Sequence, residues 1–132
     1  MLKTKFTSRD NIEELQSVDP WILVILGATI AWATPKGLPV IVTSILRELN
    51  DGISQSATHQ TGRAIDLSVK GWQAKDIEDL AEYLNKKFEK IGAISKTTGK
   101  PMACYYHNNG NGWHFHIQVR PNIKGVDLCL IS

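Results

Sequence analysis

The chain has 132 residues, of which 42% are hydrophobic and 21% charged, and its formal net charge is +2. These values exclude a disordered chain and favour a single folded domain over residues 1–132. So small a charge gives no reason to expect nucleic acid as a partner, although a mildly basic protein can approach an anionic polymer such as a bacterial wall. The two cysteines, Cys104 and Cys129, match no disulfide framework, and we expect buried free thiols.

The amino-terminal part of the chain predicts helices. Residues 8–15 have the pattern of a short capped helix, and Asp19-Pro20 supplies a cap and a first-turn proline for a helix over residues 21–33. This apolar stretch is shorter than the ~20 residues that a membrane helix needs, so we expect no membrane insertion. The first ten residues lack the apolar stretch of a signal peptide, which favours a protein made in the cytoplasm.

Two strands are predicted in the middle of the chain. Residues 40–46 are rich in β-branched side chains and lead to Arg47. Residues 64–69 alternate with period two, so that Asp66 lies on a polar face and the apolar side chains lie on the other.

The second half of the chain predicts one long helix and a hairpin. Residues 74–91 carry an apolar stripe at helical spacing, with acids early and lysines late. Residues 102–106 and 114–120 read as strands around a turn at residues 108–112. The expected fold class is α+β: a small, mostly antiparallel sheet with helices on its apolar face and the site on its polar face.

The chemistry-bearing residues together indicate a metal site. A carboxylate plus imidazoles is the ligand set of a catalytic zinc ion, which keeps one position open for water. On a helix, His59 and Asp66 would lie about 10 Å apart along the axis, too far for one ion. A turn at Gly62 can bring them together, because glycine tolerates positive φ. His114 and His116 share one face of a strand, so both could approach the metal; we favour one as ligand and the other as the group that takes a proton or stabilises the oxyanion.

Each of these residues also has a simpler interpretation. His59 alone fits a surface loop, Asp66 alone fits a cap or an ion pair, and solvent-facing histidines also produce the H-x-H pattern of residues 114–116. Arg47 is either solvent-exposed or a guanidinium that binds a substrate carboxylate or carbonyl. His107 is expected to lie apart from the site.

Three segments together resemble a known superfamily. His59-Gln-Thr-Gly-Arg-Ala-Ile-Asp66 resembles the H-x-x-G-x-A-x-D signature of the zinc D-Ala-D-Ala carboxypeptidases and related peptidoglycan L,D- and D,D-peptidases. The segment from Val42 to Arg47 resembles the preceding strand, and Trp113-His-Phe-His116 resembles the closing motif. The similarity covers about residues 39–120. That superfamily also includes the hedgehog signalling domain. The resemblance therefore implies a hedgehog-like fold.

The resemblance implies roles for individual residues. His59, Asp66 and His116 would be the zinc ligands, and Arg47 would hold the acyl or carboxylate end of the substrate. Many members carry an acid as general base three residues before the last ligand.

This chain departs from that pattern at two places. Trp113 stands where the acid is usual, and the chain looks instead like the H-x-H branch, in which His114 would assist the water. Ala57 lies two residues before His59, at a position where many members carry a serine. The hydrogen bond that this serine would make to the substrate is therefore in doubt.

The function implied by the resemblance is zinc-dependent hydrolysis of the peptide stem of bacterial peptidoglycan, of the D-Ala-D-Ala carboxypeptidase or endopeptidase type. The chain would be a monomeric, endolysin-like enzyme of a phage or prophage, released to the cell wall during lysis. The alternatives are a non-catalytic, zinc-stabilised binding module of the same fold and a virion-associated wall peptidase.

Overall fold

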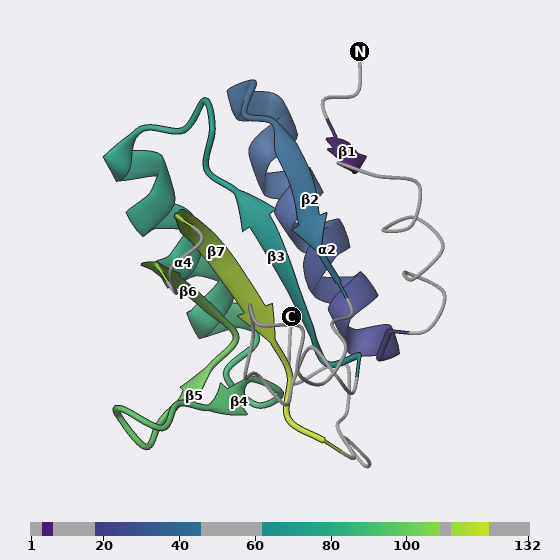
Figure 1. Cartoon of the computed structure of the whole chain (residues 1–132), viewed down its shortest axis with the longest axis vertical. Helices are drawn as coiled ribbons and strands as arrows, with labels where there is room; N and C mark the ends of the chain where they lie inside the picture. Colours follow the sequence, from purple (N-terminus) through teal and green to yellow (C-terminus); the bar gives the residue numbers. More distant parts are fainter. Residues whose placement is uncertain (1–3, 7–17, 46–61, 109–111, 122–132) are drawn as a thin grey trace.

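A computed structural model of the chain describes residues 4–6, 18–45, 62–108 and 112–121. Within these ranges the fold is α+β, as predicted: helices lie on one face of a small, mainly antiparallel sheet (Figure 1). The expected helix over residues 8–15 lies outside the described residues.

The main sheet places distant parts of the sequence side by side. Across the sheet, its strands are β1 (Thr4–Phe6), β2 (Val40–Ser44), β3 (Ala64–Ser68), β7 (Trp113–Gln118) and β6 (Cys104–Asn108). β1 runs parallel to β2, and every other neighbouring pair is antiparallel. A second, smaller sheet pairs β4 (Ala93–Ile94) with β5 (Pro101–Met102). Neither β1 nor the smaller sheet was predicted from the sequence.

Helix α2 (Pro20–Ala33) begins as the sequence indicates. The Asp19 side chain accepts a hydrogen bond from the backbone N–H of Trp21 at 2.9 Å, and proline occupies the first helical position. A short 3-10 turn, η2 (Thr34–Lys36), and Gly37 at a φ of 71° end the helix. No helix in the described ranges is long and apolar enough to cross a membrane.

Helix α4 (Ala74–Lys87) is shorter than predicted. A reciprocal capping box joins Gln73 and Asp76 at its start. The predicted helix reached Ile91, but the chain turns after Lys87. The N–H of Ile91 bonds to the carbonyl of Phe88 at 3.1 Å, which closes a tight turn toward β4. Phe88 and Ile91 remain buried in this turn. Their apolar side chains therefore indicated burial in the core and not a continuation of the helix.

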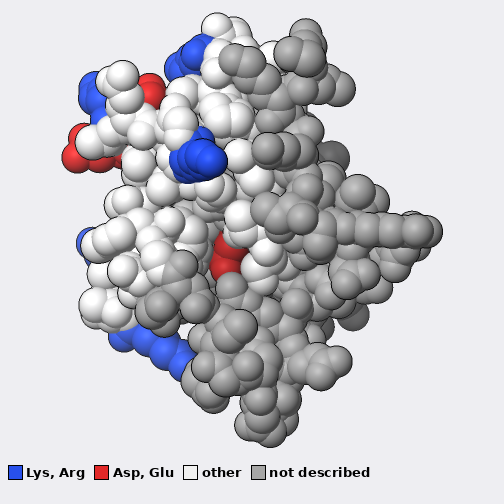
Figure 2. All heavy atoms as spheres, turned by 45° about the horizontal axis from the view of Figure 1, so that its top comes forward, with Lys and Arg blue, Asp and Glu red and all other residues white. Residues whose placement is uncertain are grey.

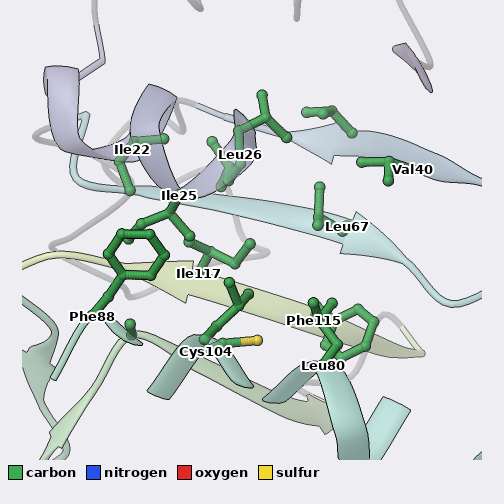
Figure 3. Packing of buried hydrophobic residues seen from close by; sticks show 14 of the residues in the cluster. Ile22, Ile25, Leu26, Val40, Leu67, Leu80, Phe88, Cys104, Phe115 and Ile117 are labelled. Carbon is green, nitrogen blue, oxygen red and sulfur yellow. The ribbon is translucent and has the colours of Figure 1, made fainter. Parts of the chain in front are cut away.

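The core lies between the helices and one face of the sheet (Figure 3). Leu67, Phe115 and Ile117 on the strands face Ile25 of α2 and Leu80 of α4, and all are fully or almost fully buried. Cys104 is a free, buried thiol in this core, as predicted, and its burial raises the pKa of the thiol. Cys129 lies outside the described residues.

The predicted strand ends were displaced by one or two residues. β2 ends at Ser44 rather than at residue 46, and β7 covers Trp113–Gln118 rather than residues 114–120. The single strand expected over residues 102–106 is divided between β5 and β6 at Ala103.

Candidate metal centre

The register of β3 against β7 brings the predicted polar residues together. Asp66 lies directly opposite His116, and Ser68 lies opposite His114. Side chains alternate between the two faces of a strand, so Asp66, His114 and His116 lie on the face away from the helices (Figure 1). Two segments separated by more than forty residues thus meet at one place.

Asp66 and His116 form a buried pair. Asp66 Oδ1 lies 3.0 Å from His116 Nδ1, and their side chains are only 2% and 4% exposed. Figure 2 shows one face of the molecule, with an acidic group recessed near its middle. An isolated carboxylate is costly to bury, so Asp66 requires a partner that carries a hydrogen or a positive charge.

His114 approaches the other oxygen of the same carboxylate. Its Nε2 lies 3.6 Å from Asp66 Oδ2. Zinc bonds of about 2.0–2.2 Å at tetrahedral angles place two donor atoms about 3.3–3.6 Å apart. The 3.0 Å between Asp66 Oδ1 and His116 Nδ1 is slightly below this range. A carboxylate and an imidazole are both donor types that zinc binds.

The orientation of His114 shows which of its ring nitrogens carries hydrogen. Nδ1 lies 2.9 Å from the carbonyl oxygen of Gly112, and a carbonyl can only accept, so Nδ1 donates. In the neutral ring Nε2 is then a bare acceptor. This atom is buried and forms no hydrogen bond within the described part of the chain. A bare nitrogen that faces a carboxylate oxygen is suited to receive a proton or to approach a cation.

Strand β6 adds two side chains to this face. His107 lies opposite His114 with ring centroids 4.6 Å apart, and Tyr105 lies opposite His116 with ring centroids 4.8 Å apart. The expectation that His107 lies apart from these histidines was therefore wrong. Burial and the nearby negative charge of Asp66 raise the pKa of Tyr105, so its hydroxyl remains a donor at neutral pH. Period-two alternation in residues 104–108 could have shown that Tyr105 and His107 share a face, but their contact with the histidines depends on the pairing of β6 with β7.

Gln118 is a further residue of this face to which the sequence interpretation gave no role. It is buried, and its Oε1 lies 3.1 Å from His116 Nε2. The alternation of Gln118 with His114 and His116 was visible in the sequence. The contact between Gln118 and His116, however, depends on side-chain geometry.

The remaining predicted site residues are not placed. His59 and Arg47 both lie within residues 46–61, outside the described part of the chain. Where the structure does describe the chain, no three His, Cys, Asp or Glu side chains are arranged to hold one ion; Asp66 and His116 provide a pair. The predicted turn before Asp66 is confirmed, because Gly62 has a φ of 72°.

No protein-family model matches the chain, and no match was found among curated proteins or solved structures.

Proposed function

We propose that the chain is a zinc-dependent peptidase that hydrolyses the peptide stem of bacterial peptidoglycan, as a D-Ala-D-Ala carboxypeptidase or endopeptidase. The observation that carries the proposal is the buried approach of His116 and His114 to the two oxygens of Asp66, at 3.0 and 3.6 Å. His59 is the proposed third ligand, on the strength of the signature that ends at Asp66.

Each of the protein groups has its own role in the proposed hydrolysis. Zinc, when bound, lowers the pKa of a water molecule toward about 7 and polarises a carbonyl group. Asp66, His116 and His59 would hold the ion. His114 would take a proton from the attacking water at Nε2, since its Nδ1 donates to the Gly112 carbonyl. Arg47 binds the substrate carboxylate or acyl group through its planar guanidinium.

Digestion of purified muropeptides tests this activity, with the masses of the products read by mass spectrometry. The zinc-loaded protein is expected to cleave the stem, and the product masses identify the bond. His114→Ala is expected to retain zinc and to lose about 10²–10⁴-fold in rate, the usual contribution of a general base. His107→Ala is the matched control, because it removes a neighbouring imidazole of the same face. A full loss in His107→Ala with normal rates in His114→Ala would assign the base to His107.

A non-catalytic, zinc-stabilised binding module is the second candidate. It is favoured by Trp113, which stands at the position of the usual acidic base and is 57% exposed. Stoichiometric zinc binding without cleavage of any peptidoglycan stem would establish this alternative.

The proposed biological setting is release to the cell wall during phage lysis, by a monomeric enzyme made in the cytoplasm. Co-expression with a holin is expected to lyse the host, and light scattering on the purified protein reports its oligomeric state. Detection of the chain in purified virions would instead support a virion-associated wall peptidase.

A further inference from the structure

We propose that one end of the molecule is a docking surface for an anionic polymer of the bacterial wall, a polyphosphodiester bonded to peptidoglycan. This surface, called the basic end, consists of six cationic residues at the end of α4, on the β4–β5 hairpin and just after β7: Lys86, Lys87, Lys90, Lys96, Lys100 and Arg120. The choice of a wall polymer rests on the proposed function. Binding is measured without cleavage, so the failure of one can be distinguished from the failure of the other.

Charge is divided unevenly along the chain. Residues 83–121 contain the six cations and one acid, Glu89, which is a formal charge of +5. The rest of the chain contains nine lysines and arginines and twelve acids, which is a formal charge of −3. Four of those acids lie in residues 74–82, at the start of α4. Because this helix is about 21 Å long, its acidic start and its basic end are separated by more than the screening length of about 10 Å at 0.1 M salt.

Backbone hydrogen bonds bring the three segments of the basic end together. The N–H of Ser95 donates to the carbonyl of Lys100 at 2.9 Å, which closes the hairpin that carries Lys96 and Lys100. The N–H of Arg120 donates to the carbonyl of Ile91 at 2.9 Å, so Arg120 lies beside the turn that follows α4. In Figure 1, β4 and β5 lie together beyond the end of α4, at the bottom of the view. The six cations therefore belong to one region of the surface.

The charges of the basic end are accessible and are not neutralised by carboxylates of the described ranges. Five of the six residues are exposed, and Lys87 is partly buried. None of the six forms an ion pair with a carboxylate of these ranges. At the opposite end of α4, by contrast, Lys75 pairs with Asp79 at 2.9 Å. Cations that lack a partner in the protein repel one another, and an anion from outside relieves this repulsion.

The types of these residues and their spacing favour repeated phosphates as the partner. Five of the six are lysines, which bind phosphate as point charges, whereas arginine is the residue suited to planar carboxylates. Lys86 and Lys90 lie about 6 Å apart along the chain direction of the helix, and Lys96 and Lys100 lie on a separate hairpin. One phosphate cannot contact all of them. A polymer with a phosphate in each repeat can, and it releases one bound counterion for each contact.

The basic end adjoins the candidate metal centre. The carbonyl of Met102 in β5 accepts a hydrogen bond from the side chain of Gln118 at 3.2 Å, and Gln118 follows His116 by two residues on β7. A wall polymer bound at the basic end would therefore hold the site close to the peptidoglycan to which that polymer is bonded.

Co-sedimentation of the full chain with purified bacterial walls measures the binding, with a chelator present to prevent cleavage. The walls are used intact and after extraction with hydrofluoric acid, which removes the polyphosphodiester. The protein is expected to bind intact walls and to bind extracted walls at least about tenfold more weakly. If about three lysines contact phosphate, the affinity for intact walls is expected to fall about 20-fold between 50 and 200 mM salt. Equal binding to intact and extracted walls overturns the proposal.

Two double variants with the same change in net charge show whether the position of the charge matters. Lys96→Gln/Lys100→Gln removes two cations from the basic end, and Lys70→Gln/Lys75→Gln removes two exposed cations near the start of α4. The first variant is expected to bind intact walls at least about tenfold more weakly at 50 mM salt and to show a shallower salt dependence. The second is expected to bind within about twofold of the wild-type protein, since its charges lie beyond the screening length. Equal losses in the two variants overturn the docking surface and leave only an effect of net charge.

A gain of binding provides a test that misfolding cannot imitate. Glu89→Gln removes the one acid of residues 83–121 and is expected to tighten binding to intact walls about two- to fivefold, the range for one exposed charge. Glu78→Gln, at the acidic start of α4, is the matched control and is expected to change the affinity less than Glu89→Gln does. Unchanged or weaker binding in Glu89→Gln contradicts the placement of the polymer over the end of α4.

Other polyanions test the choice of partner. Tighter binding to single-stranded DNA or to vesicles of anionic phospholipid than to intact walls, at equal phosphate and salt, overturns the wall polymer as the partner. Cleavage of muropeptides without binding to intact walls would refute the docking surface and retain the proposed function. Binding to intact walls without cleavage would refute the proposed function and retain the docking surface.

Discussion

Asp66→Asn is the substitution that most directly tests whether this face binds a metal. The change keeps the shape of the side chain and removes the charge that faces His116 at 3.0 Å and His114 at 3.6 Å. A ligand that binds only the folded state at about 100 times its Kd stabilises that state by about 2.7 kcal/mol. With an unfolding entropy of about 2.1 cal/mol/K per residue, or about 0.28 kcal/mol/K for 132 residues, zinc is expected to raise the Tm of the wild-type protein by about 10 °C.

Differential scanning calorimetry with and without zinc measures this shift. In Asp66→Asn the zinc-dependent rise is expected to fall to about one tenth or less, because the central anionic donor of the set is gone. Asp79→Asn is the matched control, since Asp79 is an exposed carboxylate in a surface ion pair with Lys75. Asp79→Asn is expected to keep the full shift. A full zinc shift in Asp66→Asn, or no shift in the wild-type protein, would refute the metal site at Asp66.

Three further changes test the fold. Gly92→Ala is expected to destabilise the protein by about 1–3 kcal/mol in urea unfolding, because a Cβ there would lie 2.7 Å from the Ala103 backbone nitrogen; an unchanged midpoint would contradict this packing. Gly27→Ala is expected to do the opposite and stabilise by about 0.5–1 kcal/mol, since a Cβ in this turn of α2 meets nothing within 4 Å. In a Cys129→Ser background, Cys104 is expected to resist alkylation at mildly alkaline pH until the protein unfolds, because burial raises its pKa and keeps it in the thiol form; labelling of the folded protein at the unfolded rate would show that this thiol is accessible.

The elements predicted correctly are those with a local signal. The Asp19 cap marked the start of α2, and the alternation of residues 64–68 marked β3. The end of α4 was missed because Phe88 and Ile91 continue the apolar stripe of the helix into a buried turn. β1 was missed because its existence depends on pairing with β2, far along the chain, and its three residues carry no periodic pattern of their own.

The residues of the candidate site also include some that a local pattern predicted and some that it did not. Alternation placed Asp66, His114 and His116 on one polar face, and the antiparallel register that joins them follows from which sides of β3 and β7 are apolar. The contributions of His107 and Gln118 were not predicted. They require the order of the strands across the sheet and the direction of an amide group, neither of which a one-dimensional pattern contains.

The position of Asp66 in the sheet explains how the fold holds a buried carboxylate in one place. Asp66 is 2% exposed, and a buried carboxylate is costly unless charge or hydrogen-bond donors compensate. The residues on either side of Asp66, Ile65 and Leu67, face the helices and are fully or almost fully buried. A slip of one residue between β3 and β7 would expose those apolar groups and bury the polar set against the helices. The hydrophobic core therefore holds the carboxylate opposite His116.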